Sequence, residues 1–241
     1  MRDDVVLVTG GTGVVGVGVV RRLIRSGHRV LLGYWSNGAC VQGLCDELGP
    51  DLSTVRVDLG LPDAPDRLFA ELDSRGVGVR SLVHSAALVD HTLPEDLTAE
   101  HFARVMAVNV TSGFLLVRGL AAREEFRSAV LLSSVAAEFT GMGSAAYEAS
   151  KGAVDSLTRA LAAQYAPRVR VNAVAPGVVR SHRTESDPEF SSTALSARVP
   201  GGRLAEPDDV AAAAEFLIGD QAGYMTGQVL RVDGGLSLKL L

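Results

Sequence analysis

The stretch Val5–Gly16, VVLVTGGTGVVG, joins a short apolar run directly to a glycine-rich turn. The residues that follow, up to Ser26, have the apolar spacing of an amphipathic helix. A strand, a glycine turn and a helix in this order are typical of the first unit of a doubly wound sheet. The free N–H groups of a helix N-terminus attract anions, and glycines let a phosphate approach the backbone. A glycine-rich turn without a ligand is the alternative.

The rest of the chain repeats this alternation of apolar runs and helical patterns. The runs are nearly continuous in apolar character, as expected of parallel strands covered on both faces; they are Val5–Gly10, Arg29–Trp35, Thr54–Asp58, Ser81–Ala86, Ala129–Ser134, Val169–Pro176 and Gln228–Gly234. Helical patterns cover Val14–Ser26, Ala64–Ser74, Thr98–Arg123, Ala146–Tyr165 and Pro207–Ile218. We therefore predict an α/β fold: one Rossmann-type domain over residues 1–241, a doubly wound, seven-stranded parallel sheet with helices on both faces. The irregular stretch Arg180–Ala205 predicts a functional lid or a loop.

Composition narrows the function classes. With 23 Lys and Arg against 28 Asp and Glu, the net charge of −5 argues against a nucleic-acid or membrane partner. The acidic start Met1–Asp4 does not resemble a signal peptide. The only cysteines, Cys40 and Cys45, match no zinc or redox spacing, so we expect no metal site. A cytoplasmic location is the expectation.

The first two strands predict a dinucleotide site. The expected phosphate loop consists of Gly10, Thr12, Gly13, Val14, Val15 and Gly16. An acidic residue at the end of the second strand would bind the ribose 2′-hydroxyl of NAD, and none is present there. No arginine is present either, but Ser36 and Asn37 could donate to a 2′-phosphate and Trp35 could lie against adenine. The prediction is NADPH (NADP) as the preferred cofactor, with NAD not excluded.

Tyr147 and Lys151 stand four residues apart, so both can face one ligand from a helix. Ser134 ends the fifth strand, at the edge of a doubly wound sheet where ligands bind. Asn109 occupies a long helical pattern that does not favour asparagine. Alone, the Tyr–Lys pair also fits a packed ring beside a solvated amine, but together these side chains predict a catalytic site.

These motifs resemble the short-chain dehydrogenase/reductase family, in its single-domain branch, from Val5 to Leu236. The likeness rests on five features in order: the phosphate loop, the motif Tyr147-Glu148-Ala149-Ser150-Lys151 with Ser134 and Asn109, Asn172–Gly177, Tyr224–Gln228 and Val232–Gly235. The resemblance implies that Tyr147 exchanges a proton with the substrate, that Lys151 lowers the pKa of the phenol and holds the nicotinamide ribose, and that Ser134 orients the carbonyl. It also implies that Asn109 holds a water next to Lys151. Further cofactor contacts implied by the resemblance are Asp58, Leu59, Ser85, Ala86, Ala87, Pro176, Gly177, Val179 and Ser181.

The sequence departs from the family in three places. Val14 stands where a glycine is usual in the loop, and Ser181 replaces a threonine. The family's Asn-Asn-Ala-Gly after the fourth strand is here His84-Ser85-Ala86-Ala87, and we interpret His84 as structural because Tyr147 already supplies the proton. His91 and His182 are interpreted as surface or lid residues.

The C-terminal half most resembles 3-oxoacyl-[acyl carrier protein] reductases and polyketide ketoreductases. This implies reduction of a β-ketoacyl thioester, carrier-protein bound or as a small molecule, in fatty-acid or polyketide biosynthesis. Cations that could meet an acidic carrier protein at the site entrance are Arg123, Arg127, Arg168, Arg180, Arg183 and Arg198. The resemblance also implies a homotetramer or homodimer that packs through Thr98–Arg123 and Ala146–Tyr165. Two alternatives stay open: an NAD(P)-dependent dehydrogenase that oxidises a secondary alcohol, and a catalytically silent cofactor-binding regulator.

Overall fold

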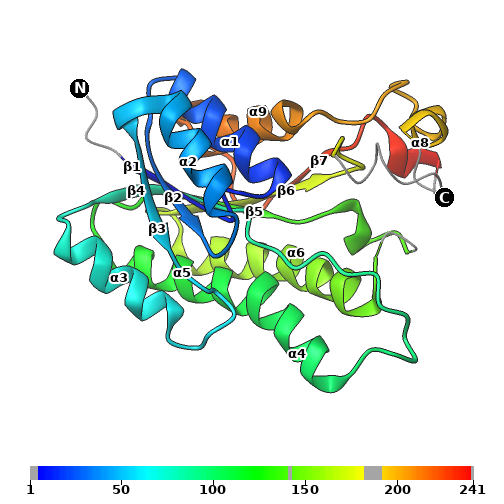
Figure 1. The fold of residues 1–241 in the computed structure, drawn as a ribbon, viewed down its shortest axis with the longest axis horizontal. Coiled ribbons are helices and arrows are strands. Elements are labelled where there is room, and N and C mark those ends of the chain that lie inside the picture. The colour runs from blue at the N-terminus through cyan, green and yellow to red at the C-terminus, as the bar shows by residue number, and fades with distance from the viewer. Residues whose placement is uncertain (1–4, 141–142, 182–191, 240–241) are drawn as a thin grey trace.

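A computed structural model describes residues 5–140, 143–181 and 192–239, and it contains the predicted sheet (Figure 1). All seven strands are parallel, in the order β3-β2-β1-β4-β5-β6-β7. Their bounds are β1 Val5–Thr9, β2 Arg29–Tyr34, β3 Leu52–Arg56, β4 Val79–His84, β5 Ser128–Leu132, β6 Arg170–Pro176 and β7 Val229–Val232. The strand order reverses direction between β1 and β4, and ligands of open α/β sheets bind at the carboxyl ends of the strands beside such a switch point.

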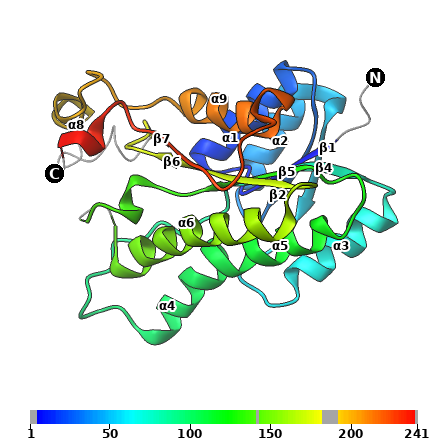
Figure 2. The same cartoon turned by 180° about the vertical axis from the view of Figure 1, so that it is seen from behind.

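Helices cover both faces of the sheet, as Figures 1 and 2 show from opposite sides. One face carries α1 (Val14–Arg25), α2 (Gly38–Leu48) and α9 (Pro207–Ile218). The other carries α3 (Ala64–Ser74), α5 (Ser112–Ala121) and α6 (Ala145–Tyr165), with α4 (Ala99–Met106) extending from α5. Each face buries its own apolar cluster, which explains why the strands lack a polar alternation.

The predicted helix Thr98–Arg123 is one helical run with an irregular centre. A π-helical turn at Ala107–Thr111 separates α4 from α5, and Asn109 sits within it. Such turns often occur at functional sites. By length and apolar composition the run Ala99–Ala121 could cross a membrane, but Leu116, Val117 and Leu120 are fully buried under the sheet. The core helix of a folded domain has the same character.

The described part of the structure contains two α-helices that the sequence did not predict, and β3 and β4 each begin two residues before their predicted start. The helix α2 was not anticipated, because its apolar face is short: Val41 and Leu44 are its buried residues. The irregular stretch Arg180–Ala205 contains the short helix α8 (Ser192–Arg198). Residues 182–191 of that stretch, with His182 and Arg183, lie outside the described residues.

Candidate active site

The phosphate loop lies at the switch point and packs closely against the end of β4. Gly10 has a φ of +67°, and a Cβ there would lie 2.5 Å from the backbone of Ala86. A Cβ on Gly16 would overlap the Gly10 carbonyl oxygen. The loop therefore needs glycine at both positions, one for conformation and contact and the other for contact alone.

Helix α1 presents an uncompensated N-terminus at this loop. Its capping residue is Gly13, which supplies no side-chain cap, and the first turn contains no acidic residue. The first-turn N–H groups of Val14, Val15 and Gly16 have no acceptor within the helix. Unpaired N–H donors, the positive end of the helix dipole and a glycine in place of a capping side chain suit the binding of the diphosphate of a dinucleotide.

A cavity of about 360 Å³ opens beside the loop. Eleven of the predicted cofactor residues line it: Gly10, Thr12, Gly13, Trp35, Ser36, Asn37, Asp58, Leu59, Ser85, Ala86 and Ala87. Leu88, Arg104 and Val108, which sequence reasoning missed, line it as well. Asn37 adopts the left-handed conformation, and its side-chain oxygen caps α2 by accepting from the Cys40 N–H, so only its amide nitrogen could donate to a ligand.

Asp58 lines the same cavity and comes two residues after the end of β3. Its Oδ1 accepts hydrogen bonds from the Gly60 N–H and from Arg104 Nη2, both at 3.0 Å. Arg104 comes from α4, and no local sequence pattern links it to Asp58. The predicted adenine contact is therefore a carboxylate already neutralised by an ion pair.

Ser134, Tyr147 and Lys151 come together at the carboxyl edge of the sheet. Ser134 follows β5, and its Oγ accepts from the Ala136 N–H at 3.1 Å. Tyr147 lies in the first turn of α6, which Ser144 caps. Lys151 is 2% exposed; its Nζ donates to the Leu132 carbonyl at 2.7 Å and lies 5.5 Å from the centre of the Tyr147 ring. The structure thus brings three of the four predicted catalytic side chains to one place.

The protonation of these groups reflects their burial. Burial raises the pKa of Tyr147, and a hydrogen bond with Ser134 opposes that rise. The net direction is opposite to the predicted lowering by Lys151, because removal from water dominates and the ammonium donates to a backbone carbonyl. Burial also lowers the pKa of Lys151 to about 8, although the nearby Asp155 carboxylate raises it. Lys151 can therefore change its charge near neutral pH.

Asn109 holds neighbouring segments together. Its Oδ1 accepts from the Leu88 N–H at 2.7 Å, and its Nδ2 donates to the Leu88 carbonyl at 3.1 Å and to Ser150 Oγ at 2.9 Å. Ser150 is the residue before Lys151 and donates to the Tyr147 carbonyl at 2.6 Å. Asn109 thereby links the loop after β4 to the turn of α6 that carries both catalytic side chains. Its predicted role in holding a water stays a prediction.

His84 has a structural setting, as interpreted from the sequence. It is 3% exposed, and its ring nitrogens contact the hydroxyls of Thr9 at 2.8 Å and Ser112 at 3.2 Å. Ser112 also donates to the Val108 carbonyl at 2.7 Å, within the π-helical turn. Burial and the charge of Lys151 lower the pKa of His84 to about 4, so the ring is neutral at neutral pH.

The remaining predicted cofactor residues follow β6 at the same edge. Pro176 ends β6, and Gly177 donates to the Val232 carbonyl at 3.0 Å. Val179 pairs with Ala205, and Ser181 is the last described residue before the gap. They lie at the ligand-binding edge but outside the cavity that the phosphate loop lines. Within residues 5–140, 143–181 and 192–239, no group of three or more His, Cys, Asp or Glu could hold a metal ion.

The prediction that six arginines border the entrance is wrong for three of them. Arg123 and Arg127 precede β5, and Arg168 precedes β6, so all three lie at the amino edge of the sheet, opposite the site. There they bond to Asp73 or to backbone carbonyls. Arg180 and Arg198 lie in the segment after β6, where Arg180 pairs with Glu206.

Comparisons with known proteins agree with this architecture. Residues 12–237 match the family described as Enoyl-(Acyl carrier protein) reductase. The 3-oxoacyl-[acyl-carrier-protein] reductase of Vibrio cholerae is 30% identical, over 98% of both chains. The 3α-hydroxysteroid dehydrogenase of Mediterraneibacter gnavus is 32% identical, over 97% of both. Among solved structures, a short-chain dehydrogenase/reductase from Serratia marcescens has a TM-score of 0.88 and 28% identity, covering 97% of this chain and 98% of that one.

Proposed function

This chain belongs to the short-chain dehydrogenase/reductase family of oxidoreductases, and from that membership we propose that it is an NADPH-dependent reductase of β-ketoacyl thioesters. The observation that carries the proposal is the convergence of Ser134, Tyr147 and Lys151 at the carboxyl edge of the sheet, the edge that also carries the phosphate loop. The relative from Vibrio cholerae, by its name, acts on 3-oxoacyl groups held by a carrier protein, and it aligns over nearly the full chain.

The bound nicotinamide would supply the hydride that reduces the carbonyl carbon. Tyr147 would hold the proton that the carbonyl oxygen receives, and its raised pKa keeps that proton on the phenol at neutral pH. Ser134 would donate a hydrogen bond to the same oxygen. Lys151, as an ammonium, would favour the phenolate left after proton transfer. The two donors, Tyr147 and Ser134, match the negative charge that develops on the carbonyl oxygen, and the cation matches the charge left on the phenol.

A turnover assay tests the proposal. Consumption of NADPH is followed by absorbance with a short 3-oxoacyl thioester, first free and then attached to an acyl carrier protein. Tyr147→Phe should abolish turnover and leave cofactor binding unchanged. Tyr165→Phe, at the other end of α6, is the matched control and should retain activity. Absence of turnover with NADPH and NADH, or full activity of Tyr147→Phe, would refute the proposal.

Oxidation of a secondary alcohol is the second candidate, supported by the hydroxysteroid dehydrogenase relative. The same side chains serve it in reverse, with Tyr147 accepting the alcohol proton. Incubation of a hydroxysteroid with NADP or NAD, followed by formation of the reduced cofactor, separates the two candidates. Higher kcat/KM for the steroid than for the 3-oxoacyl thioester would favour the dehydrogenase.

We also propose that the protein is cytoplasmic and forms a homodimer or homotetramer. Its two cysteines are free thiols, which suits a reducing compartment. The exposed faces of α4 and α6 carry Phe102 and Ala149, an apolar and a small side chain that suit contact with a second subunit. The mass in solution, measured by light scattering during gel filtration, tests the assembly; a monomer at all concentrations would exclude it.

A further inference from the structure

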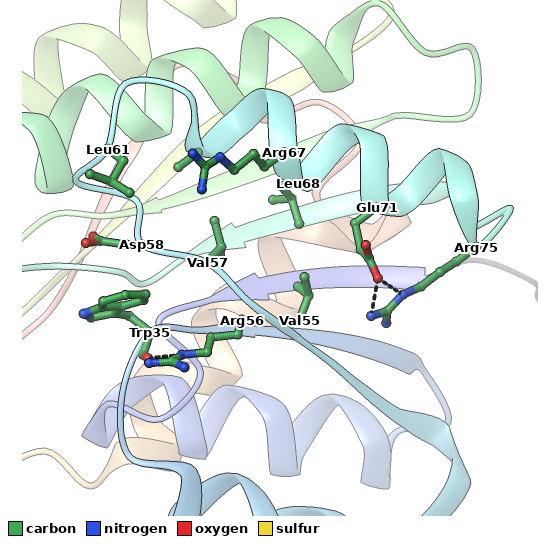
Figure 3. Close-up of a pocket in the computed structure, with 11 residues that line it drawn as sticks. Trp35, Val55, Arg56, Val57, Asp58, Leu61, Arg67, Leu68, Glu71 and Arg75 are labelled. Carbon is green, nitrogen blue, oxygen red and sulfur yellow. Dashed lines mark hydrogen bonds and ion pairs between the residues drawn. The ribbon is translucent and has the colours of Figure 1, made fainter.

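An arginine from the neighbouring strand β3 lies at the carboxyl end of β2. The segment that ends β2, Gly33–Gly38, contains neither an acidic residue nor an arginine of its own. Arg56 ends β3 and pairs in register with Tyr34 of β2. Its Nε donates to the Trp35 carbonyl at 3.1 Å. Its guanidinium carbon lies 4.7 Å from the centre of the Trp35 ring. Figure 3 shows the two side chains and the hydrogen bond that joins Arg56 to the Trp35 carbonyl. Arg56 and Trp35 are far apart in the sequence, and the pairing of β2 with β3 brings them into contact.

The position of the ribose follows from the residues that line the cavity and from the usual placement of a dinucleotide in this fold. The diphosphate would lie on the loop Gly10–Gly16, and the base would lie toward Asp58 and Leu59. The adenosine ribose between them would therefore face the end of β2, at Trp35–Asn37. In this fold the group that reads the ribose 2′-position stands there. Arg56 contacts Trp35, the first residue of that segment.

We propose that Arg56 binds the 2′-phosphate of NADPH and thereby determines the cofactor preference of this enzyme. The inference rests on the proposed NADPH dependence and names the residue responsible for it. An arginine guanidinium suits this task because it can donate two parallel hydrogen bonds to a phosphate. Ser36, exposed at the same turn, can add a hydroxyl donor.

The charges around the site favour Arg56 over its neighbours. Three arginines line a second cavity of about 400 Å³ that shares Trp35, Val57 and Asp58 with the first (Figure 3). Arg67 pairs with Asp63, and Arg75 pairs with Glu71. Within the described part of the chain, Arg56 has no carboxylate partner.

The acidic group that could repel a 2′-phosphate is also neutralised. Asp58 is the one carboxylate among the residues that line both cavities, and it is ion-paired to Arg104. The end of β2 therefore combines an available cation with a neutralised acid, which is the arrangement that a dianionic group requires.

Trp35 is the only tryptophan of the chain, so its fluorescence reports directly on this site. The protein is titrated with adenosine 2′,5′-bisphosphate and with 5′-AMP, and calorimetry measures the same two affinities independently. Wild-type protein should bind the bisphosphate more tightly. Arg56→Gln should weaken that binding roughly 10- to 100-fold and leave the affinity for 5′-AMP unchanged. Arg56→Lys, which keeps the charge but loses the paired donors, should fall between them.

Arg67→Gln is the matched control, since it removes an arginine of the same cavity that is already paired. It should keep the wild-type preference. The inference is overturned if Arg56→Gln keeps that preference or if wild-type protein binds both nucleotides equally. Neither outcome would contradict the proposed reduction of a ketone, because these titrations contain no ketone substrate and NADH could still support turnover. Loss of turnover with intact bisphosphate binding would refute the reductase and leave the role of Arg56 standing.

Discussion

The carboxylate of Asp90 accepts a hydrogen bond from the hydroxyl of Ser144, the residue that caps helix α6, with 2.5 Å between Oδ2 and Oγ. The same hydroxyl accepts the N–H of Tyr147, and the Ser144 N–H donates to the Asp90 carbonyl at 2.8 Å. Burial raises the pKa of Asp90, but hydrogen bonds from Ser144 and Thr92 outweigh it and lower the pKa to about 2. The loop after β4 thus fixes the start of the catalytic helix.

Replacement of Asp90 should reduce catalysis without reducing cofactor binding. In Asp90→Ala the Ser144 cap loses its anchor, and Tyr147 sits in the first turn that this cap orders. We expect kcat to fall about tenfold, because small displacements of a proton donor are costly. The Kd for NADPH, measured by calorimetry, should stay the same. Asp63→Ala, in an exposed ion pair of α3, is the control; equal losses in both variants would contradict a positioning role.

The sequence was sufficient for the sheet and for the order of the site motifs. The central strands are nearly continuous apolar runs between turn signals, and α3 and α9 begin and end where their patterns do. Strands β3 and β4 begin two residues earlier than predicted. Their first residues, Leu52 and Val79, are buried apolar residues like those of the helices that precede them. The spacing of apolar residues changes where a strand gives way to a helix, so this change can be seen in the sequence. The residue at which a strand ends depends on its hydrogen bonds to the adjacent strand.

Contacts between distant segments could not be predicted in this way. The pairs Asp58–Arg104, Asp90–Ser144 and Tyr34–Arg56 join residues of different elements, and none has a periodic signal. The π-helical turn at Asn109 is also hidden, because Ala107–Thr111 contains no glycine or proline that would mark a break in the helix. Arg123, Arg127 and Arg168 lie at the amino edge because each precedes a parallel strand, and the sequence around them carries no signal for the edge that a substrate approaches.

The rate of reduction should fall as the pH rises through about 8. Lys151 has its pKa lowered to about 8 by burial, and only its protonated form would stabilise the phenolate. Asp155 raises that pKa, so Asp155→Asn should move the falling limb of kcat/KM to lower pH. The pH dependence of NADPH consumption, measured at saturating cofactor, checks this.

Asp73→Asn is the control for that shift, since Asp73 pairs with Arg123 at the opposite edge of the sheet. Its limb should coincide with that of the wild type. If the falling limb of kcat/KM in Asp155→Asn keeps its wild-type position or moves to higher pH, the Asp155 carboxylate does not raise the pKa of Lys151.

Acid should destabilise the protein through His84. Its pKa is about 4 in the folded state against 6.5 for the free side chain, so between these values the unfolded chain binds a proton that the folded chain does not. This contribution to stability is complete above 6.5 and is lost as the pH falls. We expect the free energy of unfolding to drop by about 2 kcal/mol from about pH 7 to about pH 5.

Urea unfolding at the two pH values measures this drop. His84→Asn should reduce the difference between them, whatever its cost at neutral pH, because asparagine does not titrate. His28→Asn, which alters a histidine away from Thr9 and Ser112, should keep the wild-type difference. An unchanged difference in His84→Asn would assign the acid sensitivity to other groups.

Alanine at Gly16 should disrupt the phosphate loop more than alanine at a strained glycine elsewhere. The new Cβ would overlap the Gly10 carbonyl oxygen, so α1 must move away from the loop whose N–H groups would bind the diphosphate of a dinucleotide. We expect a loss of about 1–3 kcal/mol in stability from overpacking and weaker NADPH binding by calorimetry. Gly27→Ala is the comparison: its φ is +82° but nothing lies within 4 Å, so backbone strain of about 1 kcal/mol should be its only effect. Equal NADPH affinities in the two variants would mean that helix α1 does not hold the diphosphate.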